Sequence, residues 1–332
     1  MHRSPIGHYQ LFFSPSQLPQ ILHQKWGSYA VMSTIRLDEA VHAFVIYCKS
    51  KGLAPRTLET YCYALKQLQR FSEQASFAPD MPSQGDLRSL IQSMLDDGLS
   101  RGTIRIRMRA IRAFCNFLAR EGLIQASPMD GVDIPKVPSR YPEIISLEQA
   151  RRLLNAARRS TWTGTRNRAI LGTFLDTGVR LSELIGLNLE DVDVRTGTAR
   201  IRSGKGDKER HVYMGRALLR NMRKWIEVRG FHEEGTPFFL TKDGNRLDLR
   251  NVERIVSRIA ERAKLGSVRI TPHILRHTFA THYIQNGGDP FSLQRILGHS
   301  DIKTTMIYVN LAGVGLQEAH AKASPMDRLL SR

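Results

Sequence analysis

A proline-rich stretch divides this sequence into two parts, each with its own pattern of apolar residues. Residues 123–142 hold four X-Pro pairs, which end at Pro128, Pro135, Pro138 and Pro142. Proline fixes its own φ angle and biases the residue before it toward extended backbone, so such a run cannot continue a helix. A chain of 332 residues is long enough for two hydrophobic cores. We therefore interpret residues 123–142 as an extended linker between two domains.

Residues 34–122 predict a compact domain of four helices with short connectors, because apolar side chains recur there at helical spacing. The expected limits are Leu37 to Gly52, a start at Pro55, Asp86 to Gly98, and a start capped by Thr103 with Gly122 past the end. Residues 1–33 have no sustained period. We interpret them as an N-terminal extension, in part disordered, with Met32 as an alternative start.

The sequence is strongly basic, which favours a polyanionic partner. Forty-nine Lys and Arg against 31 Asp and Glu leave a net charge of +18, and nucleic acid is the usual partner of such a chain. A ribosome-like structural protein or a merely solvated surface carries a similar excess. Two helical faces hold only arginine where a solvated face would mix signs, which favours contact with a phosphate backbone or a DNA groove. These faces consist of Arg101, Arg105, Arg109 and Arg112, and of Arg250, Arg254, Arg258 and Arg262.

The three cysteines suggest a reducing compartment. Cys48, Cys62 and Cys115 form no Cys-x-x-Cys pair and have no histidine at metal-ligand spacing. An odd number of thiols fits the cytosol, where they act as small core residues. No apolar run approaches the ~20 residues of a membrane span, and the N-terminus lacks a signal-peptide pattern. The expected location is the cytoplasm.

Residues 143–312 predict a mainly helical domain with a small β-sheet. Ser146 and Gln149 form a capping box that starts its first helix. Two short strands, 199–202 and 210–214, flank a turn at 204–207 and form a hairpin with Lys205 at its tip. A further helix starts near Leu249 and carries the second arginine face. Residues 313–332 form a C-terminal tail with short helical segments.

Four motifs in this domain place basic groups beside residues that end or cap helices. In the first, Gly178 ends one helix, Arg180 lies near the start of the next, and Glu183 follows one turn later. The second is the hairpin turn with Lys205. Each of these has an ordinary structural explanation when taken alone.

The other two motifs follow in the last third of the chain. Thr271 and the proline after it suit a helix start, from which His273 and Arg276 project on one face. His299 follows a Leu-Gly pair, and Tyr308 comes nine residues later. A single tyrosine on an amphipathic helix is usually a core residue, so only the ordered set suggests chemistry.

Taken in this order, the motifs resemble the catalytic residues of the tyrosine recombinase family (phage integrase, Xer-like). The matching positions are Arg180, Lys205, His273, Arg276, His299 and Tyr308. The upstream helices resemble the family's SAM-like core-binding domain, so the likeness covers nearly everything after residue 34. The resemblance implies a mainly α fold, in which a helical core-binding domain at 34–122 precedes a mixed α+β catalytic domain at 143–312.

The resemblance also implies that Tyr308 attacks a DNA phosphodiester and forms a 3′-phosphotyrosyl bond with release of a 5′-hydroxyl. Attack builds negative charge on the phosphate oxygens, which two arginines and a histidine can stabilise. His273 is then the candidate base for the tyrosine, and Lys205 the general acid for the leaving oxygen. Glu183 and His277 have supporting roles. The phosphotyrosine keeps the energy of the broken bond, so no cofactor and no metal is expected.

Double-stranded DNA is the implied partner. The residues expected to contact it are Arg101, Arg105, Arg109, Arg112, Lys208, Arg250, Arg254 and Arg258. The family resemblance implies a homotetramer on two DNA sites, accessory recombination proteins as further partners, and no membrane. The tail at 313–332 is either a segment that docks on a neighbouring subunit or a frayed terminus.

Two other functions stay open beside site-specific recombination or integration. A type IB topoisomerase shares the residue set but works as a monomer, whereas the helical N-terminal domain favours a recombinase. A non-catalytic DNA-binding relative would lack at least one catalytic residue, and none is missing. The sequence does not distinguish chromosome-dimer resolution, phage integration and transposon movement, which share this chemistry.

Overall fold

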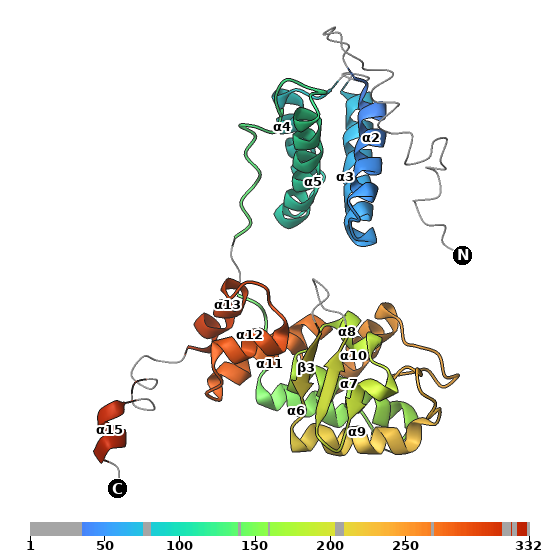
Figure 1. Ribbon diagram of the computed structural model, residues 1–332, viewed down its shortest axis with the longest axis vertical. Helices are drawn as coiled ribbons and strands as arrows, with labels where there is room; N and C mark the ends of the chain where they lie inside the picture. The colour runs from blue at the N-terminus through green and yellow to red at the C-terminus, as the bar shows by residue number, and fades with distance from the viewer. Residues whose placement is uncertain are drawn as a thin grey trace. The chain divides into compact units, whose positions relative to one another are not determined.

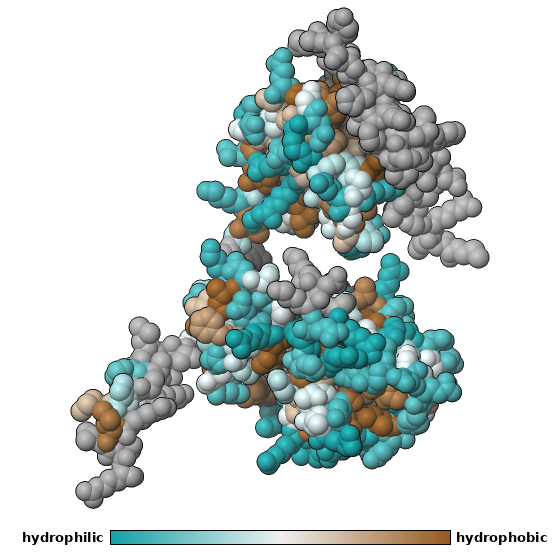
Figure 2. All heavy atoms as spheres, viewed as in Figure 1, coloured by the Kyte–Doolittle hydropathy of each residue, from teal (hydrophilic) through white to brown (hydrophobic). Residues whose placement is uncertain are grey.

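The chain divides into two compact units, residues 1–139 and 140–332 (Figure 1). The computed structural model describes residues 35–75, 81–138, 141–158, 160–202, 209–266, 269–313, 320 and 324–330. The predicted N-terminal extension lies outside these ranges, as does the predicted turn with Lys205 and Lys208. Within the described ranges, no helix is both long enough and apolar enough to cross a membrane. Hydrophilic residues cover much of the visible surface of both units (Figure 2).

The first unit contains the four predicted helices around one core. They are α2 (Leu37–Ser50), α3 (Pro55–Gln74), α4 (Gln84–Asp96) and α5 (Arg101–Arg120). Phe44 of α2 lies at the centre, where its ring meets Phe114 of α5 edge-on at 5.6 Å between centroids. Cys48 and Cys115 are buried in the same core, as expected for thiols that act as core residues. The apolar periodicity therefore predicted these helices correctly.

The start of α5 differs from the prediction, which placed the N-cap at Thr103. Ser100 is the N-cap instead: its hydroxyl accepts a hydrogen bond from the Thr103 backbone N–H at 3.2 Å, and the helix begins at Arg101. Both hydroxyl residues are good caps by type, and the earlier one closes the first turn. Similarly, α4 begins two residues before Asp86, because Ser83 and Asp86 form a capping box. Arg101 therefore belongs to the helix and extends its arginine face by a turn.

The second unit is mainly helical with one small sheet. Its first part comprises α6 (Leu147–Ala156), α7 (Trp162–Thr177), α8 (Leu181–Gly186), η3 (Leu189–Asp191), β1 (Val192–Asp193), β2 (Thr198–Ile201), β3 (Arg210–Tyr213) and α9 (Arg216–Arg229). Its second part comprises α10 (Leu249–Ala263), α11 (Pro272–Gln285), α12 (Pro290–Leu297), α13 (Lys303–Ala312) and α15 (Pro325–Leu330). The predicted capping box of Ser146 and Gln149 is confirmed at the start of α6.

The sheet has strand order β1-β2-β3, and both pairs are antiparallel. The predicted hairpin is confirmed as β2 and β3, with Ile201 opposite Arg210 at the end from which the connection between the strands leaves. The two-residue strand β1 was not predicted, because it is too short to show an alternating pattern. Helix α7 is mostly buried and packs against α9 and α11. Helices α11, α12 and α13 pack together at one end of the unit (Figure 1).

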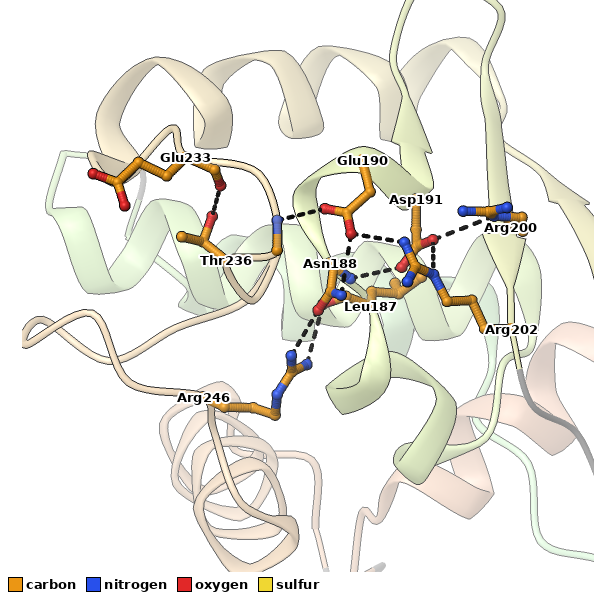
Figure 3. A network of polar contacts seen from close by, with 10 residues as sticks. Leu187, Asn188, Glu190, Asp191, Arg200, Arg202, Glu233, Thr236 and Arg246 are labelled. Atoms are coloured by element: carbon orange, nitrogen blue, oxygen red, sulfur yellow. Dashed lines mark hydrogen bonds and ion pairs between the residues drawn. The ribbon is translucent and has the colours of Figure 1, made fainter.

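A network of charged residues ties β2 to η3 (Figure 3). The Asp191 carboxylate is buried and accepts from Arg202 at 2.5 Å and from Arg200 at 3.4 Å. Arg202 also pairs with Glu190 at 2.7 Å, and Glu190 accepts from the backbone N–H of Gly235 at 3.0 Å. A buried carboxylate is stable only when its oxygens are paired in this way. The network therefore fixes the end of β2 from which the chain continues into residues 203–208.

Candidate active site

Arg180 is positioned by the tight turn between α7 and α8. Gly178 ends α7 with φ at +61°, and a Cβ there would come within 2.4 Å of the Phe279 ring, so only glycine fits. The Arg180 backbone N–H donates to the Glu183 carboxylate at 2.7 Å, and its guanidinium donates to the same carboxylate at 2.8 Å. A third hydrogen bond, at 3.0 Å, reaches the Gly298 carbonyl. The guanidinium is thus held in place while part of it stays accessible.

Glu183 joins two arginines from different elements. Arg210, the first residue of β3, donates to both of its oxygens, at 2.9 and 2.8 Å, and also to the Ile296 carbonyl at 2.8 Å. Burial raises the pKa of Glu183, but the hydrogen bonds from Arg210 and Arg180 outweigh this, so the pKa lies below its ordinary value. The carboxylate is therefore ionised at neutral pH and orients Arg180. Sequence reasoning missed Arg210 as a member of this site, since its partner lies 27 residues away.

Arg276 is buried at the junction of three segments. Thr271 caps α11 and Pro272 occupies the first turn, as predicted. Arg276 is 5% exposed and donates to the Gly178 carbonyl at 2.5 Å, to the Leu297 carbonyl at 2.8 Å and toward the His299 ring at 3.1 Å. Burial and the neighbouring Arg180 lower the pKa of Arg276 to about 10, which still leaves it charged at neutral pH. Two guanidinium groups therefore converge beside the end of α12.

The ring of His299 is held in one tautomer. Arginine carries no acceptor, so the Nε2 atom of His299, 3.1 Å from Arg276, must offer its lone pair. The proton then resides on Nδ1, which donates to the hydroxyl oxygen of Thr305 at 2.9 Å. Burial, followed by Arg276 and Arg180, lowers the pKa of His299 to about 4, so the ring is neutral. Thr305 is fully buried, and sequence reasoning missed its contact; its position three residues before Tyr308 was the only signal.

Tyr308 lies on α13 with its side chain buried against two histidines. The residue is 4% exposed, and its hydroxyl is 2.9 Å from Nδ1 of His277 on α11. The ring of His299 stacks nearly parallel to it, at an angle of 17° and 6.3 Å between centroids. Burial raises the pKa of Tyr308 above its ordinary value, while Arg276 and Arg180 act in the opposite direction. The hydroxyl is therefore protonated at neutral pH.

The structure brings together most of the residues singled out from the sequence. Arg180, Arg276, His299 and Tyr308 converge with the supporting residues Glu183 and His277. His273, at the exposed start of α11, has no hydrogen bond with Tyr308 among the described contacts. Lys205 and Lys208 lie outside the described residues.

The two predicted arginine faces differ in exposure. Arg101, Arg105 and Arg109 are exposed on α5, whereas Arg112 is half-buried and donates to the Val132 carbonyl at 3.0 Å. Its guanidinium therefore has a structural partner within the first unit. On α10, the members of the second face are all exposed. They are Arg250, Arg254, Arg258 and Arg262.

Comparison with known proteins finds a family match in each of the two units. Residues 143–313 match the phage integrase family, and residues 41–122 match the phage integrase N-terminal SAM-like domain. Tyrosine recombinase XerC of Thermodesulfovibrio yellowstonii is 32% identical over 286 residues, which are 84% of this chain and 93% of that protein. The crystal structure of XerA recombinase aligns at 29% identity with a TM-score of 0.50, over 87% of this chain and 99% of that one.

A lambda integrase tetramer bound to a Holliday junction has the same fold, with a TM-score of 0.67 at 18% identity, over 89% of this chain and 84% of that one. This chain belongs to the phage integrase family of tyrosine recombinases. It is accordingly a site-specific recombinase, an enzyme that breaks and rejoins DNA strands. The resemblance and the mainly α fold with a small sheet are thus confirmed, and neither a topoisomerase nor a non-catalytic relative gains support from these proteins.

Proposed function

We propose that Tyr308 is the nucleophile that cleaves DNA and Arg180 and Arg276 bind the scissile phosphate. The observation that supports this assignment is a buried tyrosine hydroxyl beside two converging guanidinium groups and a neutral histidine. The phenolic oxygen attacks phosphorus, a 3′-phosphotyrosyl bond forms, and the bond to the 5′ oxygen breaks. Attack by the 5′-hydroxyl of another strand reverses the step and completes the exchange.

The cations act on the charge that develops at phosphorus. Arg180 and Arg276 each offer paired donors that match phosphate oxygens. In the tautomer that Thr305 fixes, His299 supports this pair by accepting a hydrogen bond from Arg276 at Nε2. Lys205 protonates the leaving 5′ oxygen, a role that rests on the family resemblance. His273 is exposed on the face of α11 that also carries Arg276. It contacts the bound DNA strand or takes part in proton transfer. The phosphotyrosine retains the energy of the broken bond, so rejoining proceeds without ATP.

Thr305 positions His299, and a matched pair of variants tests this role. Thr305→Val keeps the shape of the side chain but removes the acceptor for the His299 Nδ1–H, so the ring loses its fixed tautomer. We expect strand cleavage to fall by about 10- to 100-fold, because a buried donor left without its acceptor costs about 1–3 kcal/mol. Thr305→Ser retains the hydroxyl and should restore most of the rate. The measurement is the rate of covalent complex formation on a nicked suicide substrate. Equal rates for the two variants would refute the role.

The arginine faces are the proposed DNA contacts. Arg101, Arg105 and Arg109 point away from the core of the first unit, and Arg250, Arg254 and Arg258 do the same on α10. Like charges in a row repel one another in the free protein, and a phosphate backbone relieves this repulsion. Arg112 and Lys208 complete the predicted set.

A homotetramer on two DNA sites is the proposed assembly, with accessory recombination proteins as further partners. The tail supports it, because α15 leaves Met326 at 61% and Leu329 at 77% exposed. These residues lie three apart on one helical face, and an apolar face of this kind suits docking on a neighbouring subunit. The cytoplasm is the proposed location, because unpaired thiols stay reduced there.

Recombination and plasmid relaxation can be distinguished directly. Binding sites are first selected from a random duplex library, and two copies are then placed in direct orientation on a supercoiled plasmid. We expect two smaller circles and a Holliday-junction intermediate, because strands are exchanged between paired sites. The chain with Tyr308→Phe serves as the control and should give no product. Relaxed plasmid without excised circles would instead favour the topoisomerase mechanism.

A further inference from the structure

Nδ1 of His277 lies 2.9 Å from the Tyr308 hydroxyl, which is within hydrogen-bond distance. It is reached from α11, whose packing against α13 brings the two side chains together. Their rings are tilted by 40° with 5.7 Å between centroids, so the contact runs edge to edge through the polar atoms. A candidate base must lie within hydrogen-bond reach of the proton that it removes. His277 meets this geometric requirement.

We propose that His277 is the base that removes the proton from Tyr308 during strand cleavage. This inference rests on the proposed function, in which Tyr308 is the nucleophile. In the step, the tyrosine O–H bond breaks and an N–H bond forms at His277 Nδ1, while the phenolic oxygen bonds to phosphorus and the 5′ oxygen leaves. The ring must therefore begin with its proton on Nε2 and its lone pair on Nδ1. When the strand is rejoined, the proton returns to the tyrosine oxygen.

The charges around His277 keep it ready to accept a proton. Burial, then His273 and Arg276 on its own helix, lower the pKa of His277 below its ordinary value of 6.5. The groups that face it from other elements are Tyr308 on α13 and His299 just before that helix. The ring is therefore neutral at neutral pH, and its lone pair is free to act. A base is also needed, because burial raises the pKa of Tyr308 above 10.0.

With His277 as the base, His273 does not have the role of base that the family resemblance implied. It lies one helical turn before His277 and is exposed. Side chains four residues apart on a helix are neighbours. His273 therefore offers the proton on His277 a route toward solvent, and the base itself is the half-buried His277.

A single substitution separates proton transfer from hydrogen bonding. His277→Asn puts a carbonyl oxygen near the position of Nδ1, so it can accept the tyrosine hydrogen bond but cannot become protonated. We expect the rate of covalent complex formation at pH 7 to fall by about 10²- to 10⁴-fold, the range for general acid–base catalysis. The wild-type rate should be flat above the pKa of His277, whereas the variant's rate should rise about tenfold per pH unit as the tyrosine ionises. A flat profile and a near wild-type rate in the variant would overturn the proposal.

A modified substrate tests which proton is involved. With a 5′-bridging phosphorothiolate, the thiolate leaves without a proton, so loss of a general acid is rescued but loss of the tyrosine's base is not. The deficit of His277→Asn should therefore persist on this substrate. If the phosphorothiolate restores its rate, His277 acts on the leaving group and the inference is wrong. The matched variant His273→Asn should keep a flat pH profile. A log-linear profile in that variant alone would assign the base to His273.

The test remains decisive if His277→Asn folds poorly. Imidazole ¹⁵N shifts of the otherwise unaltered chain should show His277 protonated on Nε2, with an Nδ1 signal that changes in Tyr308→Phe. A proton on Nδ1 would exclude the proposed direction of transfer. Failure of the proposed function is distinguishable, because it would show as a covalent complex that still forms with Tyr308→Phe, whatever the behaviour of His277.

Discussion

Replacing Tyr308 with phenylalanine should abolish the covalent DNA complex while leaving DNA binding unchanged. The substitution removes only the hydroxyl, and the ring can keep its place between His277 and His299. In the proposed mechanism the phenolic oxygen is the atom that bonds to phosphorus, and no group replaces it in the variant. Covalent complex formation is measured on a nicked suicide substrate, in which the cleaved strand cannot be rejoined and the adduct accumulates.

Binding of the same DNA without cleavage supplies the control for this experiment. The affinity of Tyr308→Phe should match that of the unaltered chain at equal salt concentration, because salt governs phosphate contacts. An adduct that persisted in the variant would mean that another residue is the nucleophile. The residue that forms this adduct would then be identified by mapping the peptide bound to the DNA.

Replacing Arg276 with lysine should lower the rate of strand cleavage by about 10²- to 10³-fold, equivalent to ~3–4 kcal/mol of transition-state stabilisation. Lysine keeps the positive charge, but it lacks the paired donors that match phosphate oxygens. The expected loss therefore reports the geometry of the guanidinium more than its charge. Single-turnover cleavage at saturating DNA separates this effect from weaker binding.

Arg276→Ala should be worse in two ways, and Arg180 provides the comparison. Alanine at 276 leaves the buried carbonyls of Gly178 and Leu297 without their partner, which costs about 1–3 kcal/mol for each unsatisfied group. Its melting temperature should fall together with its activity. The Arg180 side chain is 28% exposed, so Arg180→Ala should lose cleavage to a similar degree with a smaller loss of stability. Full activity in either folded variant would contradict the phosphate-binding role.

The sequence predicted the helices well where periodicity and end signals agree. Helix α2 follows from its apolar spacing, and α11 from Thr271 and Pro272. The predicted N-cap of α5 was wrong because Ser100 and Thr103 are both suitable by residue type. Only the backbone geometry decides between them. The strand β1 has two residues, which is too few for any alternating pattern.

The site was predictable as a set of residues but not as a set of contacts. Residues close in sequence, such as Arg180 and Glu183, could be paired from helical spacing alone. Arg210 contacts Glu183 across 27 residues, and His277 reaches Tyr308 across 31, so no local pattern contains these pairs. His273 and His277 lie four residues apart on α11, and only the packing of α13 distinguishes them.

The guanidinium of Arg276 couples the activity of the enzyme to its correct folding. It holds carbonyls at the ends of α7 and α12, and it also belongs to the proposed phosphate-binding group. The same side chain thus serves native packing and, in its proposed role, phosphate binding. A damaged or half-folded copy of a DNA-cutting enzyme is a hazard to a genome. We expect a copy in which α7 and α12 separate to lose the placement of Arg276, and with it the proposed phosphate contact.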